Sequence, residues 1–213
     1  MPTSYATLQI ECQTPLLLSE ARALLDAMQG TYDGLTAFNT IAGDLINAYR
    51  LQERYNPFPF PFYQPVLPTQ QVPAAQVVGA DQVILLQRVE LSSPGFWEFL
   101  GLLNPLDQIR RYLNDRHQRK LDLLNLPVQQ QTAQLVNENI ELQNEKLAIE
   151  NLRELLAVGR EAGIPTTQTT AMYRQYVSNN LRTLGDTVER LNATAGELVE
   201  VTPPAGTSDA GES

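Results

Sequence analysis

Apolar and polar positions alternate at the start of the chain and then change to a helical spacing. Residues 5–12 alternate strictly, which predicts a strand with one buried face. The apolar positions of this strand are Ala6, Leu8, Ile10 and Cys12. After Pro15, Ser19 is the predicted N-cap of a helix, and Gly30 and Gly34 weaken that helix near its expected end. Its apolar stripe consists of Leu24, Met28, Tyr32 and Leu35.

A second apolar run, from Gln82 to Leu91, predicts a well-buried strand because it is long and contains β-branched residues. Residues 56–73 lie between this run and the first helix, and their prolines alternate with aromatic residues. Such a composition excludes helix and favours an extended connection. The pattern therefore predicts a small α+β unit over residues 1–92, with a ferredoxin-like or related sheet-plus-helix arrangement.

The pattern becomes helical after residue 92. Ser93 and Pro94 have the order of an N-cap and a first-turn proline, which predicts a short helix over residues 96–103. Asn104 and Pro105 form a second start of this kind, for a helix over residues 105–124. The expected apolar face of that helix contains Leu106, Ile109 and Leu113, with His117 at its end.

Heptad spacing dominates the last third of the chain. Residues 128–158 and 167–200 are the two predicted helices, and the glycines and the proline between 159 and 165 predict a turn that folds them into an αα-hairpin. The first helix carries the stripe Leu135, Leu142, Ile149 and Leu156, and the second carries Leu181, Leu184, Val188 and Leu191. We expect a helical region over residues 93–201, followed by a disordered tail at 202–213.

These eight apolar residues are the expected interface. A hairpin alone leaves apolar surface uncovered, so the stripes must close either within the chain or against another molecule. The prediction is a homo-oligomer or a partner helix, with closure inside the chain as the alternative.

Residues that carry chemistry are scarce in this chain. It has one histidine, His117, and one cysteine, Cys12, which cannot form a zinc tetrad between them. Glycine-rich nucleotide loops and the serine elbow are absent from the sequence. Three carboxylates at helical spacing, Glu138, Glu141 and Glu145, are typical of a solvated helix face. We therefore expect no catalytic residue, no metal, no cofactor and no small-molecule substrate.

Charge and hydropathy restrict the partners. A net charge of -9 with only two lysines argues against binding nucleic acid. No apolar stretch approaches the length of a membrane span, and the first residues do not resemble a signal peptide. The single cysteine fits a reducing compartment, so we expect a cytoplasmic protein.

Aromatic residues between 96 and 103 leave a membrane surface open as an alternative partner. Phe96, Trp97 and Phe99 precede the basic helix at 105–124, in which Arg110 and Arg111 are the first cations. Apolar and basic side chains in this order can dock on an anionic bilayer. A helix that packs on its own sheet is the competing interpretation.

Three strings of residues resemble a bacterial family, found chiefly in cyanobacteria, for which no activity is established. They are SPGFWEFLG from Ser93, NPL from Asn104 and RYLNDRHQR from Arg111. The likeness extends from Val83 to Leu191, and no site residue follows from it. The layout also resembles, more loosely, adaptor-like domains of bacterial conflict systems.

The patterns together predict an α+β protein that acts as a non-enzymatic scaffold or adaptor, in a setting such as bacterial defence or signalling. One alternative is a peripheral membrane protein that docks through residues 96–103 and 105–124. Another is an enzyme completed by a partner chain.

Overall fold

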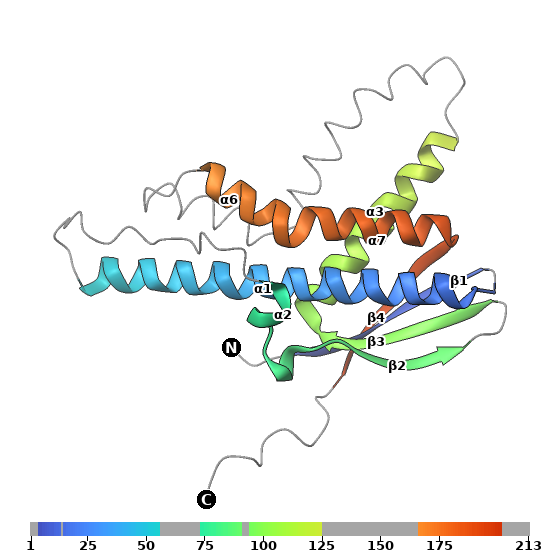
Figure 1. The fold of residues 1–213 in the computed structure, drawn as a ribbon, viewed down its shortest axis with the longest axis horizontal. Helices are drawn as coiled ribbons and strands as arrows, with labels where there is room; N and C mark the ends of the chain where they lie inside the picture. Colours follow the sequence, from blue (N-terminus) through green and yellow to red (C-terminus); the bar gives the residue numbers. More distant parts are fainter. Residues whose placement is uncertain (1–3, 14, 56–72, 91–93, 125–165, 202–213) are drawn as a thin grey trace, which may run out of the picture.

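Four strands from distant parts of the chain form one antiparallel sheet (Figure 1). The computed structural model describes residues 4–13, 15–55, 73–90, 94–124 and 166–201. The strands are β1 (Tyr5–Cys12), β2 (Leu85–Glu90), β3 (Gly95–Leu102) and β4 (Ala193–Val201). Their order across the sheet is β2-β3-β1-β4, so β2 and β4 are the edge strands.

The main helices lie on one face of this sheet (Figure 1). They are α1 (Leu18–Tyr55), α3 (Leu103–Leu124), α6 (Thr166–Tyr173) and α7 (Asn179–Arg190), with a π-helical segment (Arg174–Ser178) between α6 and α7. Two short elements, α2 (Ala74–Val77) and the 3-10 turn Ala80–Gln82, precede β2. The β-α-β-β-α-β order with this strand order is the ferredoxin-like arrangement, so the predicted α+β fold class is confirmed.

Strand β1 and the first half of α1 form the centre of the core, as their patterns predicted. Ala6, Leu8 and Ile10 are fully buried, and Cys12 is nearly so. The predicted stripe Leu24, Met28, Tyr32 and Leu35 is fully buried as well. Helix α1 continues well beyond the two glycines that were expected near its end.

The predicted short helix over 96–103 is wrong, because these residues form β3 and the beginning of α3. Burial alternates strictly along β3, with Gly95, Trp97, Phe99 and Gly101 facing the helices. This period of two is the signature of a strand with one covered face. Gly101 is required here because a Cβ at this position would collide with the ring of Tyr32.

The predicted helix over 167–200 is correct only as far as Arg190. Asn192 has a φ of 48°, a left-handed conformation that ends the helix, and β4 begins at Ala193. Strand β4 then pairs along β1, on the side opposite β3. The sheet therefore draws β3 and β4 from the region expected to be helical, and the expected boundary between residues 92 and 93 falls between the paired strands β2 and β3.

The helix predicted over 105–124 is confirmed as α3, which begins two residues earlier, at Leu103. Leu106, Ile109 and Leu113 are buried as expected, whereas His117 is exposed. The predicted connection at 56–73 except Pro73, the helix at 128–158 and the tail at 202–213 lie outside the described residues.

Candidate functional site

Strand β2 is the most exposed apolar element of the described structure. Its six residues read LLQRVE, and all are exposed except Glu90, which is half-buried. Four of the eight exposed large apolar side chains among the described residues lie on β2 or just before it. They are Val83, Leu85, Leu86 and Val89. The sequence predicted a well-buried strand here, and that prediction is wrong because β2 is an edge strand with one neighbour.

A β-bulge at Gln87 determines which way these side chains point. Leu86 is opposite Phe99 and Arg88 is opposite Glu98, so β2 has one residue more than β3 between these pairs. Paired residues share a face of the sheet. Leu86 and Val89, which pair with the buried Phe99 and Trp97, therefore both point to the helix side at the rim of the sheet.

The opposite face of the sheet carries a row of mainly apolar side chains. Leu85, Leu100, Thr7 and Val199 follow one another directly across the four strands. Leu85 and Val199, at the two edges, are about half exposed, at 51% and 49%. Among the described helices, none lies on this face (Figure 1). The apolar character of β2 thus continues across the side of the sheet that faces away from the described helices, where Thr7 in the middle of the row is buried at 7% exposure.

The side chain of Arg88 lies over the face of the sheet that points away from the helices, here called the open face, and not at the rim formed by Leu86 and Val89. Its guanidinium is 4.9 Å from the centre of the Phe96 ring and 3.6 Å from the carboxylate of Glu90. Both contacts are with residues of the chain itself, so the positive charge is held above the sheet. The rim formed by Leu86 and Val89 stays apolar.

Of the eight residues predicted to form a helix interface, four belong to the core and the other four lie outside the described residues. Leu181, Leu184, Val188 and Leu191 are at most 5% exposed and belong to the core. Helix α7 packs against α1 and α3, so this stripe closes within the chain, which was the alternative to an interface. Leu135, Leu142, Ile149 and Leu156 lie outside the described residues.

The residues considered for membrane or partner contact are mostly buried or engaged in ion pairs within the chain. Trp97 and Phe99 are buried under the helices at 5% and 2% exposure, and Phe96 is half-buried beneath Arg88. Trp97 and Phe99 are therefore not accessible for the membrane contact that was considered as an alternative. The two cations considered with them, Arg110 and Arg111, both form ion pairs with Asp107, at 2.9 and 2.7 Å.

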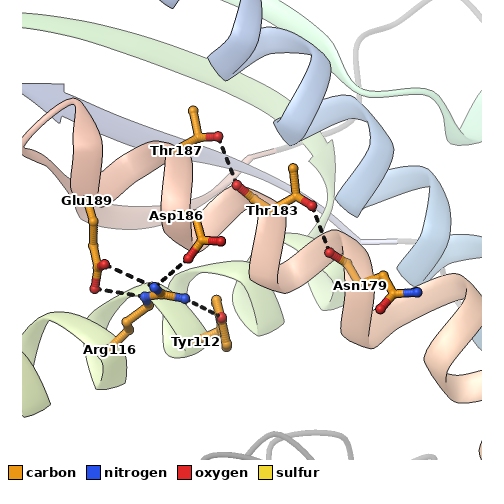
Figure 2. A network of polar contacts seen from close by, with 7 residues as sticks. All are labelled: Tyr112, Arg116, Asn179, Thr183, Asp186, Thr187 and Glu189. Atoms are coloured by element: carbon orange, nitrogen blue, oxygen red, sulfur yellow. Dashed lines mark hydrogen bonds and ion pairs between the residues drawn. The ribbon is translucent and has the colours of Figure 1, made fainter.

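Arg116 connects α3 to α7 through the network shown in Figure 2. Its guanidinium donates to both carboxylate oxygens of Glu189, at 2.8 and 3.0 Å, and to Asp186 at 2.7 Å. A fourth bond, at 3.1 Å, goes to the hydroxyl of Tyr112. These hydrogen bonds raise the pKa of Arg116, and the bond from Arg116 lowers the pKa of Glu189. The network closes an interface between two helices, which is a structural role.

This network also explains Gly185. A Cβ at this position would meet the guanidinium of Arg116. The hydroxyls of Thr183 and Thr187, on the same helix, donate to the carbonyls four residues earlier, at 2.9 and 2.8 Å (Figure 2). The polar groups of this part of α7 are therefore satisfied locally.

The single histidine and the single cysteine are on different elements and differ in burial. His117 is exposed on α3, where it lines a small hollow with Lys120 and Glu189. Cys12 is 2% exposed at the end of β1, and burial raises the pKa of its thiol. In the described parts of the chain, no group of three or more His, Cys, Asp or Glu side chains could hold a metal ion. Glu138, Glu141 and Glu145 lie outside them.

No protein-family model, no curated protein and no solved structure matches the chain. The resemblance seen in residues 83–191 therefore stays a prediction. Among the helices that the structure describes, none has both the length and the apolar content needed to cross a membrane.

Proposed function

We propose that the chain is a non-enzymatic scaffold or adaptor that associates with a second copy of itself through β2. The observation that carries the proposal is the apolar rim of Leu86 and Val89 on an exposed edge strand. An edge strand presents unpaired N–H and C=O groups, and a second strand that pairs with them gains main-chain hydrogen bonds. The apolar rim adds burial to this pairing.

The bulge makes β2 suited to pairing with its own copy. In a two-fold symmetric antiparallel pair over the whole strand, Leu85 is opposite Glu90 of the copy and Leu86 is opposite Val89 of the copy. Residues that face each other in such a pair must point to the same side of the sheet. In a regular strand, Leu86 and Val89 would point to opposite sides, because they are three positions apart. The bulge at Gln87 places them on the same side.

The resulting interface is symmetric, as most homodimer interfaces are. Leu86 of each copy packs against Val89 of the other, so the two-fold axis generates two such contacts. The two four-stranded sheets become one continuous sheet, with both helical layers on the same side. Arg88 stays above the open face, where Phe96 and Glu90 hold it.

The positions of the two side chains best suited to catalysis, His117 and Cys12, support a binding role over a catalytic one. His117 and Cys12 lie on different elements, and the thiol of Cys12 is buried. A cytoplasmic location would keep that thiol reduced, so we place the protein there.

Light scattering coupled to size exclusion tests the proposal. The wild-type chain is expected to have twice the mass of one chain, and Leu86→Lys combined with Val89→Lys is expected to give a monomer. Leu121→Lys on α3 is the matched control, because Leu121 is exposed to nearly the same degree as Leu86, at 41% against 43%. A monomeric wild type, or a dimer that survives the double substitution, would refute the proposal. Binding of a different protein to β2, with a monomeric free chain, would assign the edge to a foreign partner instead.

A further inference from the structure

The open face of the sheet is divided into an apolar half and an acidic half. The apolar half is the row across the four strands that has Leu85 and Val199 at its two ends, each about half exposed. Further along the central strands, the register places Glu98 two residues from this row and Glu11 four residues from it, on the same face. A strand rises about 3.4 Å per residue, so the two glutamates lie about 7 and 14 Å from the apolar row.

The charges of these two glutamates are not balanced within the chain. In the parts of the chain that the structure describes, neither Glu11 nor Glu98 has an ion-pair partner, and both are at least partly exposed. The nearby cation on this face, Arg88, lies 3.6 Å from the carboxylate of Glu90 and 4.9 Å from the centre of the Phe96 ring. Because Glu90 already engages the charge of Arg88, the second half of the face is left with a net negative charge.

Apolar surface on the open face is accessible mainly at its two edges. Leu100 and Thr7, in the middle of the row, are half-buried and 7% exposed, respectively. Four neighbouring strands span about 14 Å from the first to the last. A molecule that covers both Leu85 and Val199 must therefore lie across all four strands, a length of about ten residues if it is helical.

The acidic half decides between the possible occupants of this face. Nucleic acids and anionic lipids carry charges of the same sign as Glu11 and Glu98, and so does the same face of a second copy, which disfavours all three. An uncharged apolar segment would remove the two carboxylates from water without giving them a partner, and this costs free energy. A segment with lysines or arginines beside an apolar stripe matches both halves.

We propose that the open face binds a basic amphipathic segment of a partner protein, which lies across the four strands. The apolar side of the segment covers Leu85 and Val199, and its lysines or arginines lie over Glu98 and Glu11. This surface gives the proposed adaptor a site for a second protein, so it rests on the proposed binding role. It does not depend on the pairing of β2, because all of its residues come from one copy.

Isothermal titration calorimetry of the full chain with the synthetic peptide (LKKLLKL)₂ tests the proposal, because this peptide has leucines on one side and lysines on the other when it is helical. We expect (LKKLLKL)₂ to bind and (LEELLEL)₂, with glutamates in place of lysines, not to bind. Glu11→Lys combined with Glu98→Lys is expected to weaken the binding by about tenfold or more, because like charges then face each other. Asp44→Lys combined with Asp115→Lys is the matched control, since it changes the net charge equally at exposed positions on α1 and α3. This control is expected to keep the affinity of the wild type.

Two-dimensional ¹⁵N–¹H NMR with (LKKLLKL)₂ locates the binding surface. The amide resonances of residues 7–11, 96–100 and 197–199 are expected to shift. Val199→Ser is expected to weaken the binding, whereas Leu121→Ser, at another exposed apolar position, is expected to leave it unchanged. Absence of binding, shifts confined to the helices, or equal weakening by the two pairs of charge reversals would overturn the proposal.

The β2 pair and the open-face site can fail separately. Leu86→Lys combined with Val89→Lys changes side chains that point to the helix side, so this variant is expected to bind (LKKLLKL)₂ as the wild type does, whatever its mass in light scattering. Loss of peptide binding in this variant would show that the open-face site needs the paired form, which would contradict a surface made by one copy.

Discussion

Gly34 of α1 lies so close to the carbonyl oxygen of Tyr176 that a Cβ on Gly34 would overlap it. Tyr176 belongs to the π-helical segment, in which the regular helical hydrogen bonds are interrupted. Its carbonyl accepts a bond from the side chain of Asn180 at 3.0 Å. The backbones of α1 and of the α6–α7 helix therefore approach each other closely at a glycine on one side and at an irregular turn on the other.

Gly34→Ala is expected to lower the free energy of unfolding by about 1 to 3 kcal/mol, the usual cost of overpacking a core. The reason is that the added methyl group meets backbone, which cannot move as a flexible side chain could. Thermal or urea denaturation measures the effect. Gly43→Ala in the same helix is the control, because a Cβ there has nothing within 4 Å. It is expected to be neutral, or to stabilise by up to about 1 kcal/mol. Equal effects of the two substitutions would contradict the close packing at Gly34.

The ion pair between Arg116 and Glu189 is expected to make stability depend on pH. The pKa of Glu189 is lower in the folded state because Arg116 hydrogen-bonds to its carboxylate. The resulting stability is present above the unfolded pKa of a glutamate, about 4.3, and is lost as the pH falls through the lower folded pKa. Glu189→Gln should therefore destabilise the protein at pH 7 and lose most of this effect at pH 3.

Urea denaturation at these two pH values measures the difference, and Glu197→Gln on β4 is the control, because Glu197 is exposed. The control is expected to behave like the wild type at both pH values. If Glu189→Gln were as stable as the wild type at pH 7, the ion pair would contribute nothing to stability.

The thiol of Cys12 is expected to be unreactive in the folded protein. Burial raises its pKa, which leaves little thiolate near neutral pH, and its exposed fraction of 2% blocks access. Ellman's reagent at pH 8 should react only after denaturant is added. Stoichiometric reaction within the mixing time of a native sample would show that β1 opens at this end.

The elements that could be predicted from sequence are those with one clear period. Alternation identified β1, and the caps at Asn104 and Pro105 identified α3 to within two residues. Strand β3 was missed because Ser93 and Pro94 have the order of a helix start, although the residues that follow alternate. Strand β4 was missed because Ala195 and Leu198 continue the heptad spacing of α7, while the real end of the helix depends on the left-handed conformation of Asn192.

The candidate sites depend on neighbours that local patterns do not contain. An apolar run such as β2 can occupy the centre or the edge of a sheet, and only the strand order shows that it lies at the edge. One local signal was present, since Gln87, Arg88 and Glu90 are more polar than the middle of a buried strand requires.

The register of the proposed β2 pair can be measured directly by disulfide formation between copies. Leu86→Cys combined with Val89→Cys places one thiol opposite another across the two-fold axis, at the separation that a disulfide needs. Under mild oxidation the account predicts a covalent dimer from this double variant, with Cys12 left in place because it is buried. Leu85→Cys with Val89→Cys puts the thiols on opposite faces and should stay uncrosslinked. A double variant at 86 and 89 that remains monomeric, or equal crosslinking by the control pair, would contradict self-pairing through β2.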